Sequence, residues 1–330
     1  VQQQRIELWK KHNSLQPGRP MILVFPEGSW GELLPHDTME CESRHARGIE
    51  WALRSRLYYH EHFDDDTVIE NTWTVPAVVH DSGWGLQAQH IDSDAARGAW
   101  AFDPVINEPA DLKKIKFPEI TYDEEATKRN LAFAEDLFGD ILEVKPKKVS
   151  RLCFHLMAQY TGWRGLEQVL MDMVTDPDWV HEAMELLTQG HLHRIRQHVD
   201  QNLLSLNNDN TYNTSGGNGW TDELPAEGFD PEHVRQCDCW SFAESQEFAV
   251  VGPDMHREFA LQYEARLLDG WGLTGYGCCD APDQKLDDVF ELLPNIRRIS
   301  IAPSAKVDVC APQMTGDYIF SWKPQPAHLV

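Results

Sequence analysis

Four consecutive polar side chains follow an apolar run near the middle of the chain. Leu203–Leu206 leads directly into Asn207, Asn208, Asp209 and Asn210. Asn and Asp are common in turns, but a buried core does not hold four amide or carboxylate groups in succession. We therefore interpret this block as part of a functional site. We expect Asp209 to assist proton transfer and Asn207 and Asn208 to bind or orient a substrate.

A second polar block, residues 276–280, follows another apolar run and contains thiols and a carboxylate. Cys278, Cys279 and Asp280 are candidate metal ligands, and Tyr276 is a candidate catalytic residue. Neighbouring residues on a strand point to opposite faces, so only one of two adjacent cysteines enters a site easily. The alternative is that these cysteines are ordinary packing residues.

Further candidates stand at the ends of other apolar runs. Glu244 is a possible general acid or metal ligand, although a carboxylate at a helix N-terminus is the simpler explanation. His155 could point into a substrate site or be a buried histidine with a structural role. Lys323 and Trp322 could contact an anion or an aromatic ring of a substrate.

Short apolar runs alternate with longer amphipathic segments along the whole chain. The runs predict strands at Met21–Phe25, Val68–Val79, Val149–Leu156, Leu203–Asn207, Leu273–Cys278, Arg298–Ala302 and Tyr318–Trp322. The amphipathic segments predict helices at Arg47–His62, Leu166–Val174, Pro177–Asp200, Pro253–Asp269 and Gln284–Leu293.

Alternating strands and helices are typical of a parallel α/β sheet. We expect one barrel domain over residues 1–330, with insertions near 81–122 and 211–236. The polar clusters would then lie at the carboxyl ends of the strands, where barrel enzymes have their active sites.

Composition excludes several classes of protein. The formal net charge of −24 argues against nucleic-acid binding, which needs clustered Lys and Arg. No apolar run approaches the roughly 20 residues that cross a bilayer. The seven cysteines form an odd number without a secretory signal, which favours free thiols in a reducing cytoplasm.

Several segments resemble the uroporphyrinogen decarboxylase-like superfamily. They are RGLEQVLMDMVTDPDWVHEAM, LLSLNNDNTY, DELPAEGFDPEHVR, CWSFAESQEF, GYGCCDAPDQKLDDVFELLPNIRRISIAP and DYIFSWKPQPAHL. The resemblance implies a (β/α)8 barrel of the TIM type in which Tyr318–Lys323 is the seventh strand, so a last βα unit would be missing from residues 1–330. It also implies either cofactor-free decarboxylation or zinc-dependent methyl transfer to or from a corrinoid protein.

Two departures from the family pattern bear on which of these reactions we expect. The stretch Met21–Gly28 lacks the arginine-rich signature that grips a porphyrinogen, and Tyr276-Gly277-Cys278 keeps the cysteine but not the histidine of the zinc motif. We expect a zinc-assisted methyltransferase that moves a methyl group between a small methylated substrate and a separate corrinoid protein, with a homodimer possible. The alternatives are a metal-free lyase that acts on a smaller carboxylic acid through Asp209, and a non-catalytic ligand-binding barrel.

Overall fold

A computed structural model of the protein describes residues 1–94, 98–213, 215–325 and 327. Its central feature is a sheet of five parallel strands in the order β13-β12-β11-β10-β7. The strands are short, and the central strands β10, β11 and most of β12 are buried, as parallel strands covered on both faces are, whereas the edge strand β13 is partly exposed. They are β7 (Cys153–Phe154), β10 (Trp240–Ala243), β11 (Leu273–Tyr276), β12 (Ile296–Ile301) and β13 (Ile319–Trp322).

A second parallel pair, β1 (Thr72–Pro76) with β6 (Glu143–Lys147), continues this arrangement. After β6, Val149 forms a parallel bridge with Leu204. The chain then enters β7, which pairs with β10. One extended run, residues 143–154, therefore connects the pair to the five-stranded sheet. All of these strands are parallel.

The mixed α/β class with parallel strands is confirmed, whereas no closed barrel is present in the described residues. There, β13 pairs with β12 alone and β1 with β6 alone. Helix α1 (Gln2–Asn13) and the hairpin of β8 (Tyr212–Asn213) and β9 (Gly217–Asn218) pack beside β12. Arg298 of β12 donates hydrogen bonds to Asn13 Oδ1 at 2.7 Å and to Gly217 O at 3.1 Å.

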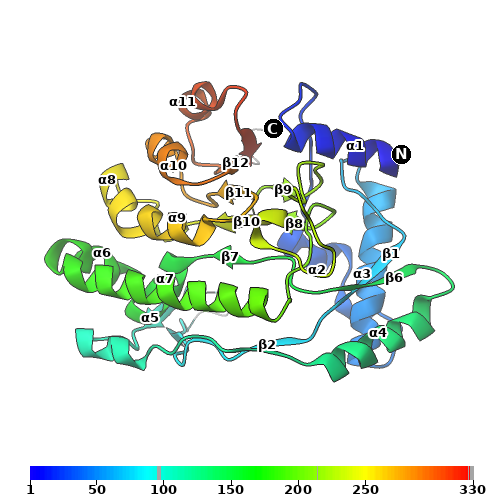
Figure 1. The fold of residues 1–330 in the computed structure, drawn as a ribbon, viewed down its shortest axis with the longest axis horizontal. Coiled ribbons are helices and arrows are strands. Elements are labelled where there is room, and N and C mark those ends of the chain that lie inside the picture. The colour runs from blue at the N-terminus through cyan, green and yellow to red at the C-terminus, as the bar shows by residue number, and fades with distance from the viewer. Residues whose placement is uncertain (95–97, 214, 326, 328–330) are drawn as a thin grey trace.

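Helices cover the outside of the five-stranded sheet and follow one another in chain order (Figure 1). Their apolar faces form the main core with the strands, around Phe154, Trp163, Phe259 and Trp271. The helices are α5 (Leu156–Arg164), α6 (Leu166–Thr175), α7 (Pro177–Asp200), α8 (Pro253–His256), α9 (Gln262–Leu268), α10 (Leu286–Leu292) and α11 (Val307–Cys310), and a π-helical stretch, Arg257–Leu261, joins α8 to α9.

The remaining elements lie around the β1–β6 pair and in the two predicted insertions. Helices α2 (Trp30–Leu33), α3 (Arg44–His62) and α4 (Glu124–Phe138) belong to the first group. Residues 79–122 form two antiparallel pairs, β2 (Val79–Asp81) with β5 (Ile120–Tyr122) and β3 (Gln89–Ile91) with β4 (Ala101–Asp103). The hairpin of β8 and β9 lies in the insertion near 211–236.

Two of the strand predictions were wrong. Met21–Phe25 is extended but pairs with no strand in the described structure, and Leu203–Asn207 forms only the bridge at Leu204. There the buried side chain of Asn207 replaces strand pairing, because it accepts a hydrogen bond from Trp240 N at 2.8 Å and donates to Trp240 O at 2.9 Å and Ser150 O at 2.8 Å.

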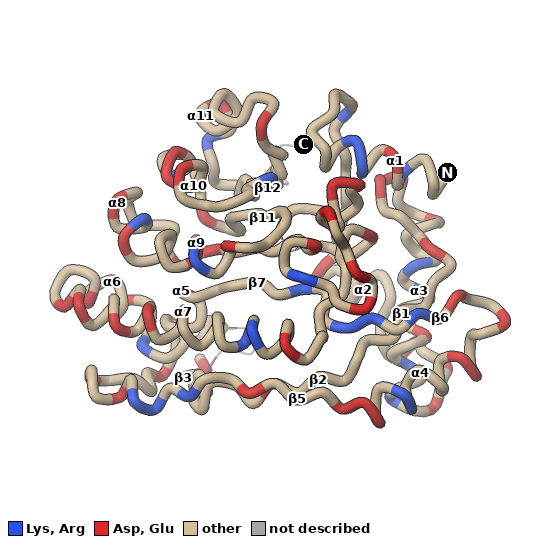
Figure 2. The backbone as a smooth tube through the Cα atoms, viewed as in Figure 1, with Lys and Arg blue, Asp and Glu red and all other residues tan. Residues whose placement is uncertain are grey.

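Acidic side chains are spread over the outer helices, including α4, α6 and α10 (Figure 2). This distribution matches the strongly negative net charge. In the described part of the chain, none of the helices combines the length and the apolar character needed to span a membrane.

Candidate functional site

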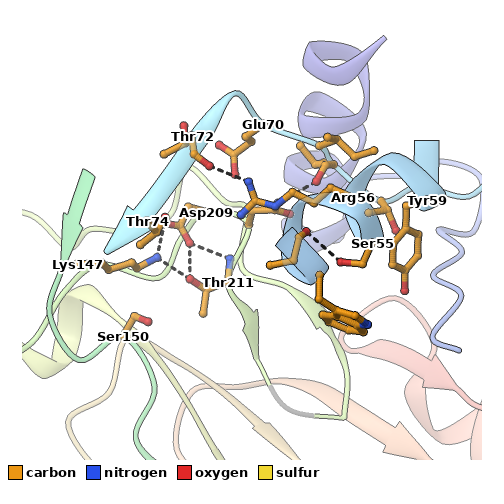
Figure 3. Close-up of a pocket in the computed structure, with 16 residues that line it drawn as sticks. Ser55, Arg56, Tyr59, Glu70, Thr72, Thr74, Lys147, Ser150, Asp209 and Thr211 are labelled. Atoms are coloured by element: carbon orange, nitrogen blue, oxygen red, sulfur yellow. Dashed lines mark hydrogen bonds and ion pairs between the residues drawn. The ribbon is translucent and has the colours of Figure 1, made fainter. Parts of the chain in front are cut away.

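A cavity of about 510 Å³ lies between α3 and the β1–β6 pair (Figure 3). The walls come from four segments that are far apart in the sequence. They are α3, residues 67–74 before and within β1, Lys147 at the end of β6 with Ser150 beyond it, and residues 209–211 beyond the Leu204 bridge. The cavity contains charged groups of both signs together with many hydroxyl groups, and Trp51 and Tyr59 of α3 give it an aromatic side.

Asp209 is held rigidly on one side of this cavity. Its carboxylate accepts hydrogen bonds from Thr211 N at 2.9 Å and Thr211 Oγ1 at 2.6 Å, a local turn that Asp commonly makes. Lys147 Nζ lies 2.6 Å from Asp209 Oδ2 and 2.7 Å from Thr211 Oγ1. The carboxylate is therefore fixed by three donors, one of them a cation.

Glu70 faces the same space from the segment before β1 (Figure 3). Burial raises the pKa of its carboxyl group, and the nearby negative charge of Asp209 raises it further. Partial offsets come from a hydrogen bond with the Asn210 side chain and from the positive charges of Lys145 and Lys147. The two carboxyl groups thus have different surroundings, because Asp209 is ion-paired with Lys147 whereas Glu70 has a raised pKa, and such a difference can separate an acid from a base in one site.

Arg56 of α3 supplies a second cation to the cavity. Its guanidinium donates to Thr72 O at 3.0 Å and lies 5.3 Å from the centre of the Trp73 ring. Burial lowers the pKa of Arg56, and the charge of Glu70 opposes this shift. A partly desolvated guanidinium is well suited to binding a carboxylate, because its fork of N–H groups matches the two carboxylate oxygens.

The structure divides the predicted Asn/Asp block between two roles. Asp209 and Asn210 line the cavity, where Asn210 also donates to Val68 O at 2.9 Å. The Asn207 side chain instead donates hydrogen bonds to Ser150 O and to Trp240 O of β10. The Asn208 side chain donates to Leu224 O at 2.6 Å. The two residues expected to bind substrate thus fix the backbone that carries Asp209.

His155 and Glu244, which were singled out separately, form a pair at the carboxyl ends of β7 and β10. His155 Nδ1 lies 2.6 Å from Glu244 Oε1, and Glu244 Oε2 accepts a hydrogen bond from Gln246 N at 2.9 Å. Glu244 is buried, whereas the imidazole is 42% exposed. A buried carboxylate that orients a partly exposed histidine is a geometry suited to a general base, although His155 does not line the cavity described above.

Tyr276, a predicted catalytic residue, points toward the helices. Its hydroxyl donates to Glu264 Oε2 of α9 at 2.9 Å and lies 2.8 Å from His256 Nε2 of α8. Burial raises the pKa of Glu264 to about 8 and lowers that of His256 to about 3. All three groups are therefore neutral at pH 7, and they form a buried hydrogen-bonded chain.

The three predicted metal ligands do not converge. The sulfur atoms of Cys278 and Cys279 are 3.6 Å apart, but the buried Asp280 carboxylate pairs with Lys285 Nζ at 3.4 Å. Burial raises the pKa of the Cys278 thiol to about 11. Across the residues that the structure describes, no group of three or more His, Cys, Asp or Glu side chains is arranged to hold an ion. These residues, as placed, do not fit a zinc site.

Trp322 ends β13 and Lys323 follows it, at the edge of the five-stranded sheet opposite β7. Lys323 Nζ donates to Ser300 Oγ at 2.6 Å and to Ser215 O, and it lines a separate cavity of about 240 Å³. Trp322 lines the same cavity and is 44% exposed. This cavity shares no lining residue with the one that holds Asp209.

Sequence reasoning missed Arg56, Glu70 and Lys147, which complete the larger cavity. None of them stands at the end of an apolar run that was recognised as a strand. Lys147 ends β6, whose sequence EVKPK has too little apolar character to indicate a strand.

Comparisons of the chain with protein families, curated proteins and solved structures found no match.

Proposed function

We propose that this protein is a metal-independent lyase that decarboxylates a small carboxylic acid in the cavity between α3 and the β1–β6 pair. The observation that carries the proposal is the grouping of Arg56, Glu70, Lys147 and Asp209 around one cavity. The fold would be an open relative of the (β/α)8 barrel, in line with the resemblance of the sequence to the uroporphyrinogen decarboxylase-like superfamily.

A 3-oxo acid is the class of substrate that this site can decarboxylate without a cofactor. The bond to the carboxylate carbon breaks, carbon dioxide leaves, and the electron pair moves onto the ketone oxygen as an enolate. In the proposed step Glu70, whose pKa is raised by burial and by the nearby charge of Asp209, gives a proton to the carbon. Solvent reprotonates Glu70, so the cycle needs no oxidant, reductant or metal.

The cations and the fixed carboxylate have complementary tasks in this step. Arg56 holds a carboxylate of the substrate, while Lys147 lies where it can stabilise the developing enolate. Asp209, anchored by Lys147 and Thr211, contributes to the raised pKa of Glu70 and so favours proton retention there. Asp209 therefore acts through Glu70 and is a positioning residue in this scheme.

The proposal is tested by measuring carbon dioxide release from a panel of 3-oxo acids after dialysis against a chelator. We expect turnover without added metal and a rise in KM of about 10- to 100-fold in Arg56→Met, the loss expected for one hydrogen bond to a charged group. Arg54→Met is the matched control, because Arg54 lies on the same helix and pairs with Glu50 at 2.7 Å outside the cavity. Equal KM values for the two variants would contradict the assigned role of Arg56.

Zinc-assisted methyl transfer with a corrinoid partner has less support. The family resemblance favours it, but Asp280 is turned toward Lys285 and away from the two sulfur atoms. Metal analysis of the wild-type protein and Cys278→Ala distinguishes the two proposals. About one equivalent of zinc that disappears in the variant would favour methyl transfer and count against the lyase.

A further inference from the structure

Lys323 is a partly buried amine whose polar contacts are neutral. Its Nζ donates to the backbone oxygen of Ser215 and to Ser300 Oγ. Among the described residues, no carboxylate lies within ion-pair distance of this amine, whereas the buried Lys285 is paired with Asp280. A buried ammonium group without a counter-charge is destabilised relative to the neutral amine.

The surroundings of Lys323 carry little negative charge. Cys278 and Cys279 approach from the end of β11, and Arg298 from β12 adds a further positive charge. Burial lowers the pKa of Lys323 to about 8; Cys278 and Cys279 oppose this shift, and the charge of Arg298 adds to it. Tyr212 and His12 also line the cavity, and burial raises the pKa of the tyrosine and lowers that of the histidine to about 4. Both are thus neutral at pH 8, and Glu27 is the one acid among the lining residues.

Lys323 lines a cavity of about 240 Å³ in which aromatic and aliphatic side chains alternate with polar groups. Phe25 and Tyr212 form part of its wall, with ring centres 4.8 Å apart. Leu23, Phe320 and Trp322 complete the apolar side. A lysine whose pKa is lowered by burial, and which lines a cavity with aromatic side chains, can act as a nucleophile toward carbonyl groups.

We propose that Lys323 forms an imine with an apolar or aromatic aldehyde or ketone bound in this cavity. The nitrogen lone pair attacks the carbonyl carbon and a C–N bond forms. Both protons of the neutral amine leave with the carbonyl oxygen as water, which leaves a C=N bond. This site is separate from the cavity of Asp209 and does not depend on the lyase proposal.

Reductive trapping on the wild-type protein tests this directly. Benzaldehyde with sodium cyanoborohydride converts an imine into a stable benzylamine, because the borohydride supplies the hydride. Cleavage after Lys306 gives a peptide in which Lys323 is the only Lys or Arg within residues 307–330, so mass spectrometry reports its labelling separately. Lys285 is the buried, ion-paired control, and Lys128, paired with Glu124 at 2.8 Å, is the exposed control.

At pH 8 we expect Lys323 to be labelled on the order of 100-fold faster than Lys128, the factor for a pKa near 8 against an ordinary lysine near 10.4. The labelling rate should rise with pH and level off above about 8, and the preference should vanish in urea. Labelling of Lys323 no faster than Lys128, or the same preference in unfolded protein, would overturn the proposal. So would protection of Lys323 by acetate without any trapped product, because that would indicate an anion site.

Lys323→Arg keeps the positive charge and removes the nucleophile. We expect benzaldehyde to raise the melting temperature of the wild-type protein but not that of this variant. Equal stabilisation of a folded variant would contradict imine formation. If the variant fails to fold, the trapping result on the wild-type protein decides the proposal.

Discussion

Buried charged side chains in this protein are held by several partners at once. Arg164 and Asp172, both buried, form a bidentate pair with Nε–Oδ2 and NH2–Oδ1 distances of 2.7 and 3.2 Å. Gln168 adds a donor to Asp172 at 2.9 Å, and Arg164 lies 4.4 Å from the centre of the Trp179 ring. Removing one partner would leave a buried cation without its counter-charge, which costs far more than the pair contributes.

We therefore expect Asp172→Asn to lower the free energy of unfolding by about 3–5 kcal/mol in urea denaturation. Glu124→Gln is the control, because it removes an exposed ion pair with Lys128 and should change stability by less than about 0.5 kcal/mol. Similar effects of the two substitutions would show that the Arg164–Asp172 pair is not desolvated in solution.

At the scale of elements, the insertion near residues 81–122 packs against helix α7. Trp84 of the insertion packs against α7 at Gly190, where an added Cβ would lie 2.3 Å from Trp84 Cζ3. Gly48 in α3 offers the opposite case, because nothing lies within 4 Å of its added Cβ. The same substitution should therefore have opposite effects in the two helices.

We expect Gly190→Ala to destabilise the protein by about 1–3 kcal/mol, since overpacking outweighs the gain in helix propensity. Gly48→Ala should stabilise it by about 0.5–1 kcal/mol, because only the propensity changes. Thermal unfolding of both variants shows whether Gly190→Ala lowers the stability of the protein and Gly48→Ala raises it. A stabilising Gly190→Ala would mean that Trp84 does not pack on α7.

Elements with a strong pattern could be predicted from the sequence, and those without one could not. Helix α7 begins at Pro177 and ends at Asp200, as its capping signals and apolar period predicted. Strand β10 has only four residues and no turn residues close enough to mark it, so it was missed. Asp209 was found because it follows an apolar run. Arg56, Glu70 and Lys147 were not, because tertiary contacts bring the cavity together, such as the one between Lys147 and Asp209 across 62 positions.

At the scale of the whole molecule, buried neutral groups set the dependence of stability on pH. The folded-state pKa of Glu264 is raised to about 8 from 4.5, so its contribution is complete below pH 4.5 and is lost as the pH rises through 8. His191 and His256 have folded-state pKa values lowered to about 3 from 6.5. Their contribution is complete above pH 6.5 and is lost as the pH falls toward 3.

Glu264→Gln should therefore flatten the alkaline side of the stability curve. Between pH 5 and 8 we expect the wild type to lose at least about 1.4 kcal/mol more than the variant, the free energy of one pKa unit. Glutamine keeps partners for Tyr276 and Ser245, so the acid side should stay unchanged. Urea denaturation at several pH values measures both sides, and parallel curves would show that Glu264 is ionised in the folded protein.

The most direct measurement of the central proposal is the rate of carbon dioxide release by Glu70→Gln beside the wild type, with a 3-oxo acid that the wild type decarboxylates. Glutamine preserves the size of the side chain but cannot donate the proton to the carbanion. We predict a fall in kcat of about 100-fold or more, with an unchanged circular dichroism spectrum and a KM within about threefold. A folded variant that retains the wild-type kcat would contradict the assignment of Glu70 as the proton donor and, with it, the proposed site.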